Sequence, residues 1–600
     1  MKSSNGSGLI TGFMLFFFCL NISVIKAQSV AFSGFVLNKA GQPLENVHVL
    51  LNETHYHAVT DSSGSFSIKD LTPGSYSLTI RSVGYQAYKK SITIPSGGLH
   101  HFSAVLQTRL YTSNAVVITA TRTRKALEDV SVPMTVIDDK QIENTGSMRL
   151  SDILAEQTGL RLVGDHGVGI QVQGFSSDYT LIMINGQPLI GRRAGTLDLS
   201  RITVGNVKQI EMIKGPSSAL WGSHALAGVI NIITEKAQQP FSLELTSRYG
   251  THQTLDAGAN LSWKIDNWSN TFFINRNSSG GYRLVPSSIT QTVPDYRNYT
   301  ASYRTSIDIS DRVEAGFYGR YYHESQDIAS FLGEANDPTM LDIDATLQNY
   351  GINPSLRVQL TDNLELEVNH FLSGYKTERN LFYESSGDLY EQSLYDQTYN
   401  KSELKATQVW NSNHISTLGS GLSREQLNSD RYNSDTNLNT FFIYGQHDWL
   451  ITPRLNVIGG FRYDRSNEYG SQLSPKFSAQ YKVTDWLHVR ASVGSGFKAP
   501  AFRHLFLSFT NPSVGYSVLG AANVVERIKE MQAQGKIERL LVPLEQLGNP
   551  INAEQSWAYN AGLELYPTSK LHFRVNLFRN NVTDLIESAP IAIKTNGQSA

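Results

Sequence analysis

Residues 208–234, KQIEMIKGPSSALWGSHALAGVINIIT, decide the fold of this chain. An alternating apolar run ends at Gly215-Pro216, a dipeptide typical of turns, and small residues with single glycines follow it. Residues 229–233 (VINII) then form a short apolar run that predicts a buried strand. The stretch contains no nucleophile–base pair and no metal-ligand spacing. It therefore predicts a compact α/β element with a structural role rather than a catalytic site.

The first residues predict that the chain is exported. Lys2 precedes an apolar run over residues 9–20, and residues 25–27 (IKA) follow as a cleavage site. This arrangement is typical of a secretory signal peptide, here residues 1–27. A transmembrane anchor is the alternative, but the apolar run is short. The one cysteine, Cys19, lies inside this segment, so we expect no disulfide or thiol chemistry in the mature chain.

Composition narrows the class of protein. The chain has 600 residues, more than one ordinary domain, and its net charge of −2 gives no basic field for nucleic acid. No apolar run after residue 28 approaches the roughly 18–20 residues of a spanning helix, so an exported membrane protein of this sequence is expected to form a closed β-barrel. The sequence contains no HExxH, GxSxG, P-loop or GxGxxG motif, so we expect that the chain is not an enzyme.

Alternating segments fill residues 238–600 and predict the wall of that barrel. Residues 487–493 (LHVRASV) and 571–577 (LHFRVNL) place apolar and polar side chains on opposite faces, as a lipid-facing strand requires. Short turn signals recur along this region, and five tryptophans flank them as an interfacial girdle would: Trp263, Trp268, Trp410, Trp449 and Trp486. Seven such turns predict about 15 strands. Because an odd number cannot close a bacterial barrel, we expect the chain to continue beyond Ala600.

The stretch at residues 208–234 closely resembles the end of the plug domain of TonB-dependent outer-membrane receptors, whose usual form is IEVIRGPSSALYGSNAIGGVINIIT. The resemblance implies a mainly β fold: an antiparallel transmembrane barrel of about 22 strands, of which about 15 are present, plugged by an α/β domain at residues 126–237. It further implies a transporter in the outer membrane of a Gram-negative bacterium. That transporter would contact outer-membrane lipid and be energised by TonB with ExbB and ExbD.

Two segments precede the plug. Residues 28–107 alternate short strands and turns, which predicts a small β-sandwich that resembles the carboxypeptidase-regulatory-like domain. Its His55 and His57 could share a strand face and hold a metal, although such a pair is usually a surface feature. Residues 108–125 form a polar linker with one exposed, β-prone strip, Ala115-Val116-Val117-Ile118-Thr119, which resembles a TonB box. Such a strip suits strand addition to a partner's sheet edge, while an edge strand of the sandwich is the alternative.

The cargo is predicted from two boxes and two histidines. Phe497 and Lys498, and then Asn549 and Pro550, stand in segments that resemble the FRAP and NPNL boxes of haem receptors. Lys498 replaces the usual arginine, and residues 552–553 depart from the second box. The segments GLRLVGDHGVGIQVQGF and FKAPAFRHLFLSFTN resemble Porphyromonas-type haem receptors.

His166 and His504 are therefore the predicted ligands of haem iron, which accepts imidazole axially. In this interpretation haem is transported rather than kept as a cofactor, and it would arrive free, on a haem-protein or from a surface lipoprotein. A ferric siderophore, cobalamin or a glycan is the alternative cargo. Residues 524–534 predict a short helix in the long loop between the boxes.

Overall fold

The computed structural model describes residues 29–600 except 39–40, 46, 52–55, 83–84, 86–87, 107–115, 124, 165–166, 193–194, 334–337, 433–435, 485, 512–513 and 569–570. The predicted signal peptide and three predicted site residues, His55, Ala115 and His166, lie outside the described residues. The chain divides into two compact units, Met1–Asn114 and Ala115–Ala600. No helix among the described residues is both long and apolar enough to cross a membrane.

The first unit is a β-sandwich, as its alternating sequence predicts. One sheet has the order β4 (Ser65–Leu71), β1 (Val30–Asn38), β7 (Leu99–Leu106). The other has the order β3 (Tyr56–Val59), β2 (His48–Leu51), β5 (Gly74–Arg81), β6 (Tyr88–Ile94). Every second side chain points inward, so that Phe32, Val36, Leu78 and Ile80 are fully buried between the sheets. His57 lies exposed on β3, and the described residues contain no metal-binding group of three or more His, Cys, Asp or Glu.

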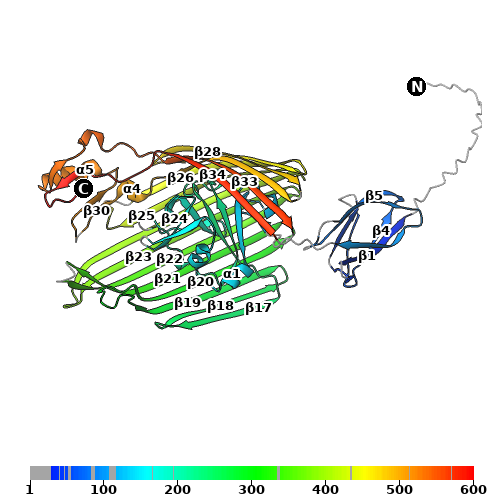
Figure 1. The fold of residues 1–600 in the computed structure, drawn as a ribbon, viewed down its shortest axis with the longest axis horizontal. Helices are drawn as coiled ribbons and strands as arrows, with labels where there is room; N and C mark the ends of the chain where they lie inside the picture. Colours follow the sequence, from blue (N-terminus) through cyan, green and yellow to red (C-terminus); the bar gives the residue numbers. More distant parts are fainter. Residues whose placement is uncertain are drawn as a thin grey trace, which may run out of the picture. The chain divides into compact units, whose positions relative to one another are not determined.

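The plug is a five-stranded mixed sheet in the order β10 (Met134–Asp138), β15 (Val207–Lys214), β16 (Gly228–Thr234), β13 (Thr180–Ile184), β14 (Gln187–Pro188). Residues 208–234 supply β15, the short helix α3 (Ser218–Trp221) and β16, which confirms the α/β element expected there. Helices α1 (Asp139–Thr145) and α2 (Leu150–Ala155) and the hairpin β11 (Leu160–Gly164)–β12 (Val168–Val172) complete it. Figure 1 shows these elements inside the curve of a large sheet.

That large sheet is antiparallel and has 15 strands, which confirms the predicted number. Its edges are β17 and β34. The strands, in order, are β17 (Phe241–Gly250), β18 (Thr254–Ile265), β19 (Trp268–Tyr282), β20 (Val293–Ser310), β21 (Val313–Leu332), β22 (Thr339–Thr361), β23 (Leu364–Tyr383), β24 (Leu389–Asn411), β25 (His414–Ser429), β26 (Thr436–Thr452), β27 (Leu455–Ser466), β28 (Gly470–Thr484), β29 (Leu487–Lys498), β33 (Glu554–Thr568) and β34 (Leu571–Thr583).

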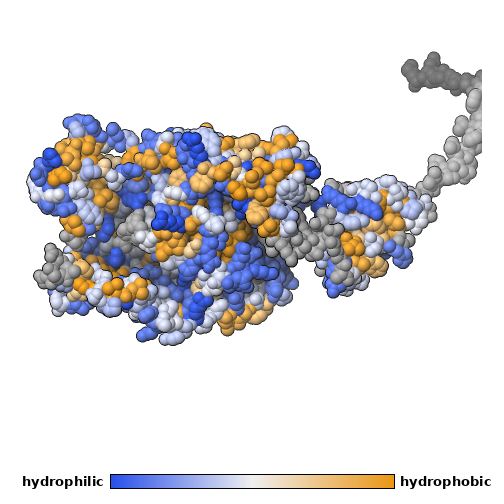
Figure 2. Space-filling model, viewed as in Figure 1, coloured by the Kyte–Doolittle hydropathy of each residue, from blue (hydrophilic) through white to orange (hydrophobic). Residues whose placement is uncertain are grey.

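Apolar and polar side chains alternate along these strands, which gives the sheet an apolar outer face. Outward side chains such as Leu404, Leu422 and Phe441 are exposed, whereas their inward neighbours such as Tyr444 are buried against the plug. Apolar surface covers the edge strand β34 in Figure 2. Trp268, Trp410, Trp449 and Trp486 lie exposed beside the short turns, in agreement with the predicted girdle.

The two ends of the barrel differ. Short turns join the strands at one end and longer loops at the other, the pattern that outer-membrane barrels show at their periplasmic and outer ends. Strands β22 and β24 have 23 residues each, whereas a tilted strand needs only about 9–11 to cross a bilayer. These strands therefore continue well beyond the membrane at the loop end.

The longest loop, residues 499–553, carries helices α4 (Phe502–Phe506) and α5 (Val524–Ala533). Strands β30 (Ser508–Thr510) and β31 (Ser517–Leu519) form one hairpin, while β32 (Ile537–Leu540) pairs with β35 (Ala592–Lys594) near the end of the chain. Val524, Ile528 and Met531 bury one face of α5 in a local apolar cluster, and the helix itself confirms the one predicted there.

Candidate functional site

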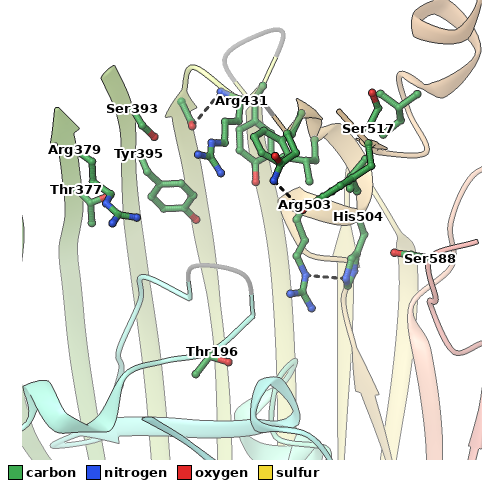
Figure 3. A pocket seen from close by; sticks show the side chains of 18 of the residues that line it. Thr196, Thr377, Arg379, Ser393, Tyr395, Arg431, Arg503, His504, Ser517 and Ser588 are labelled. Carbon is green, nitrogen blue, oxygen red and sulfur yellow. Dashed lines mark hydrogen bonds between the residues drawn. The ribbon is translucent and has the colours of Figure 1, made fainter. Parts of the chain in front are cut away.

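A large cavity lies between the plug and the loop end of the barrel. Its volume is about 1880 Å³, enough for a bulky ligand. Plug loops supply Gly167, Val168 and Thr196, the tall strands β21 to β24 form one wall, and the 499–553 loop forms the other. Figure 3 shows Thr196 below the cavity and side chains of the wall and the loop above it.

Four arginines among the described residues line this cavity: the buried Arg201 of the plug, and three that come from the barrel strands and loops. Arg379 lies on β23, Arg431 follows β25, and Arg503 lies on α4 (Figure 3). The Arg431 guanidinium stacks 4.4 Å from the centroid of Phe509, and one of its nitrogens is 4.0 Å from a Glu391 oxygen. Arginine presents five N–H donors in a planar fork, which suits oxygen-rich anions. The three side chains therefore form a polar clamp that an oxygen-bearing ligand could occupy.

Carboxylates also line the cavity, but the protein's own donors engage two of them. Asp198 accepts hydrogen bonds from the backbone N–H groups of Val168 (3.1 Å) and Ser200 (3.0 Å). Glu324 accepts them from the Tyr322 hydroxyl (2.6 Å) and from Gln326 (3.1 Å). These contacts hold both carboxylates to the plug loop and the tall wall.

His504 lines the cavity, but its hydrogen bonds do not prepare it for a metal. Arg503 Nε–H donates to His504 Nε2 at 3.0 Å, and the Ala501 backbone N–H faces Nδ1 at 3.3 Å. Iron ligation through Nε2 requires a proton on Nδ1, where it would meet another N–H donor instead of an acceptor. Burial, followed by the charges of Arg503 and Lys498, lowers the pKa of His504 from 6.5 to about 4. The ring is thus neutral at neutral pH and is held as an acceptor.

The other predicted ligand residues divide between the cavity and the packing beneath it. Asn549 lines the cavity, whereas Phe497, Lys498 and Pro550 are not among the described residues that line it. Phe497 is 2% exposed and packs against Tyr469, with ring centroids 6.0 Å apart. The FKAP segment therefore supports the base of the loop.

Lys498 fastens the barrel to the plug. Its Nζ lies 2.5 Å from Asp178 Oδ2 and 4.1 Å from the centroid of the Tyr179 ring. Burial alone would raise the pKa of Asp178, but the charge and the hydrogen bond of Lys498 lower it to about 2. Arg503 reaches the same carboxylate at 3.1 Å. Asp178 thus links the plug both to β29 and to the cavity loop.

The strip that resembles a TonB box is docked on the plug. Val116 and Val117 form β8 (Val116–Val117), which pairs with β9 (Lys125–Ala126). Val117 and Thr119 are fully buried, so the expectation of an exposed strip is wrong for these two residues, while Val116 and Ile118 remain exposed. The strip alternates between a face that fits the plug and a face that meets solvent, because its backbone is extended.

A buried carboxylate of the plug holds this strip in place. Glu211 Oε2 accepts hydrogen bonds from the N–H of Ile118 (3.1 Å), the N–H of Thr119 (2.8 Å) and the Thr119 hydroxyl (2.5 Å). Asn231 donates to the same hydroxyl at 2.9 Å, and the Trp221 indole donates to the Thr119 carbonyl at 3.0 Å. Glu211 is itself fully buried on β15. The strip can leave only if these bonds break.

The next residues fasten the same segment to the barrel wall. Arg122 forms an ion pair with Glu403 at 2.6 Å and stacks on Trp221 and Tyr444, at 4.4 and 4.7 Å from their centroids. Lys125 forms a second ion pair with Asp448, also at 2.6 Å. Residues 116–125 therefore connect the start of the plug to strands β24 and β26.

These features identify the family of the chain. Residues 240–599 match the TonB-dependent receptor-like β-barrel, residues 126–229 the TonB-dependent receptor plug domain, and residues 31–107 the carboxypeptidase regulatory-like domain. The chain belongs to the TonB-dependent receptors, which are outer-membrane receptors and transporters of Gram-negative bacteria and not enzymes. It is thus an outer-membrane protein.

Two named relatives each match about two thirds of this chain or more. The vitamin B12 transporter BtuB of Vibrio vulnificus (strain CMCP6) is 27% identical over 422 residues, 66% of this chain and 64% of the relative. The iron-regulated outer membrane virulence protein of Vibrio cholerae (strain O395) is 24% identical, over 72% of this chain and 67% of the relative. The chain thus spans about 64% of the length of that B12 transporter.

Solved structures show the same fold. The siderophore receptor PirA from Acinetobacter baumannii superposes with a TM-score of 0.60 at 16% identity, and the match covers 77% of this chain and 72% of that one. The ferric enterobactin receptor PfeA gives a TM-score of 0.59, also at 16% identity, over 75% of this chain and 72% of that one. These likenesses concern the fold and leave the cargo to be argued from the cavity.

Proposed function

We propose that this chain takes up a ferric siderophore across the outer membrane. The observation that carries the proposal is the clamp of Arg379, Arg431 and Arg503 in a cavity of about 1880 Å³. Iron chelates of this class present negatively charged oxygen groups on a bulky body, and planar guanidinium forks bind such groups in a bidentate manner. Cobalamin is the second candidate, because the B12 transporter of Vibrio vulnificus is a relative at 27% identity.

Energy would come from TonB, with ExbB and ExbD, through the docked strip. Val116 and Ile118 expose side chains, and the strip's extended backbone suits pairing with a partner's sheet edge once it leaves Glu211. Deletion of residues 115–120 is expected to abolish uptake and to leave cargo binding intact. Normal uptake by this deletion variant would contradict the proposed coupling.

Haem remains a cargo to test because His504 lines the cavity. The donor contacts around its ring argue against ligation, and its predicted partner His166 lies outside the described residues. An absorbance titration of the purified full chain with haem distinguishes haem ligation by these histidines from its absence. Low-spin haem that is lost in the His166→Ala, His504→Ala double variant would favour haem over a siderophore.

Radiolabelled iron uptake tests the siderophore directly. The full chain is produced in a strain that lacks its own receptors, and catecholate, hydroxamate and carboxylate siderophores are supplied in turn. Arg431→Met is expected to weaken binding roughly 10–100-fold, because a charge-assisted hydrogen bond contributes about 1.5–3 kcal/mol. Arg297→Met is the matched control, since Arg297 lies exposed on β20 and is not among the described residues that line the cavity. Tight binding of cobalamin and of no siderophore would overturn the proposal.

A further inference from the structure

The outer face of the barrel carries a pair of histidines beside the short turns. His414 opens β25 and lies directly opposite Trp449 of β26, while His447 lies opposite Ser416. The register places all four on the face that carries the exposed Leu418, two residues after Ser416. This face is on the opposite side of the wall from the cavity, so the cargo site has no use for the pair.

The separation of the two rings suits a shared metal ion. His414 Nδ1 and His447 Nε2 are 3.1 Å apart. An ion held at about 2.05 Å from both nitrogens, the usual Zn–N length, would subtend an N–metal–N angle of about 98°. That angle falls between the square-planar and tetrahedral values. The spacing of the two nitrogens thus matches that of two adjacent ligands of one ion.

A neighbouring serine can hold His447 in the tautomer that a metal needs. His447 Nδ1 lies 2.8 Å from Ser416 Oγ, and the Trp410 indole N–H donates to the same oxygen at 2.9 Å. A serine oxygen has two lone pairs, so it can accept from both. With its proton on Nδ1, His447 directs the lone pair of Nε2 toward His414. Hydrogen bonds of this kind orient the ligands of metal sites.

The second ring is held by stacking. His414 lies on Trp449, with centroids 5.4 Å apart and an interplanar angle of 25°. We propose that His414 and His447 form a two-histidine site for a borderline divalent cation, Cu²⁺, Ni²⁺ or Zn²⁺, that clips β25 to β26 at the periplasmic edge of the membrane. The described residues offer no third His, Cys, Asp or Glu for the ion, so water completes its coordination. Among these ions Cu²⁺ is expected to bind most tightly.

Electron paramagnetic resonance with Cu²⁺ tests the site on the full chain, purified in detergent without an affinity tag. We expect one Cu²⁺ with two nitrogen donors in the wild type and one nitrogen in His414→Phe or His447→Phe. Loss of a supporting group costs metal sites roughly 10–100-fold in affinity, so Ser416→Ala should weaken binding about tenfold and each histidine variant at least as much. His370→Phe is the matched control, because His370 Nδ1 also lies 2.9 Å from a serine, Ser402, yet is alone on its strand.

Labelling with ¹⁵N-histidine makes the test independent of variants that fail to fold. The copper spectrum of the labelled wild type should then show coupling to two ¹⁵N nuclei. Coupling to one nitrogen, or an equal loss of binding in the His370→Phe control, would overturn the proposal. Failure of Cu²⁺ to bind the wild type would also overturn the proposal. The two histidines would then serve only as members of a chain of hydrogen bonds that starts at Trp410. None of these outcomes depends on the cargo.

Discussion

Replacement of Glu211 by glutamine should release the strip that resembles a TonB box. The carboxylate receives three hydrogen bonds from Ile118 and Thr119 on one oxygen. Its other oxygen accepts from Gln209 at 2.7 Å, and Gln209 also donates to the Val116 carbonyl at 3.0 Å. An amide at position 211 can satisfy one of these two sets of donors with its oxygen, and it must present its own N–H groups to the other.

The expected effect follows from the charge that is lost. A hydrogen bond to a charged group contributes about 1.5–3 kcal/mol, against about 0.5–1.5 kcal/mol for a neutral one. With three bonds from the strip, Glu211→Gln should destabilise the docked state by about 3 kcal/mol. This corresponds to a shift of roughly 100-fold in the ratio of docked to released strip. Thr119→Val removes the hydroxyl that donates to Glu211 and accepts from Asn231, and it should destabilise the docked state by about 2 kcal/mol.

A spin label on the strip measures the released fraction. Ile118→Cys is a suitable position, because its side chain is 39% exposed and the one native cysteine, Cys19, lies in the predicted signal peptide. In the parent we expect an immobilised spectrum, and in Glu211→Gln a dominant mobile component. The measurement uses the full chain in native outer membranes, without cargo.

Glu564→Gln is the control for the loss of a buried carboxylate as such. Glu564 is 3% exposed and pairs with Arg490 at 2.7 Å and Arg574 at 2.8 Å, away from the strip. Its variant should leave the label immobilised. A label that stays equally immobile in Glu211→Gln would refute the role assigned to Glu211, and mobility in both variants would indicate general loosening of the plug instead.

Three further changes follow from contacts described above. The loop around His504 should open more easily as pH falls from 6.5 to 4, because the ring binds a proton in the open loop while it stays neutral in the closed one. The closed loop should lose up to about 3 kcal/mol of stability. Hydrogen exchange of the loop should show this pH dependence, and His504→Asn should abolish it. Lys498→Met removes the nearest cation of Asp178 but leaves Arg503 at 3.1 Å, so it should cost about 1.5–3 kcal/mol, read as faster proteolysis of the plug. Gly228→Ala would place a Cβ 2.3 Å from the Ile213 carbonyl oxygen and should lower thermal stability by roughly 1–3 kcal/mol, while an unchanged melting temperature would contradict the tight β15–β16 contact.

The fold could be predicted because its strongest determinants are local. Period-two segments such as residues 487–493 form the observed strand β29, and the apolar run at residues 229–233 lies within β16. Turn signals at residues such as aspartate, asparagine and proline predicted the number of strands. This prediction did not require knowing which strands pair with each other. Register and alternation are properties of adjacent residues, so they can be read from one chain.

The cavity was less accessible to prediction because its groups come from distant positions. Arg379, Arg431 and Arg503 have no motif in common, and they meet only because β23, the loop after β25 and α4 share one end of the barrel. Sequence drew attention to the FKAP segment, whose Lys498 proved to bind the plug. The docked state of the strip also depends on Glu211, which is 92 residues away from Thr119. Nothing near Thr119 in the sequence indicates that partner.

The geometry of the docked strip determines how it yields to force. β8 and β9 form an antiparallel pair whose first strand is nearer the chain's beginning, so tension applied ahead of Val116 pulls at the open end of the pair. Such loading peels contacts one after another instead of shearing them together. The pairing of Val116 and Val117 with β9 would give way first and the bonds of Ile118 and Thr119 next, and the ion pair of Arg122 with Glu403 would bear load only afterwards. The segment therefore has two force thresholds. A weak pull frees the strip, and a stronger pull is needed to move the plug.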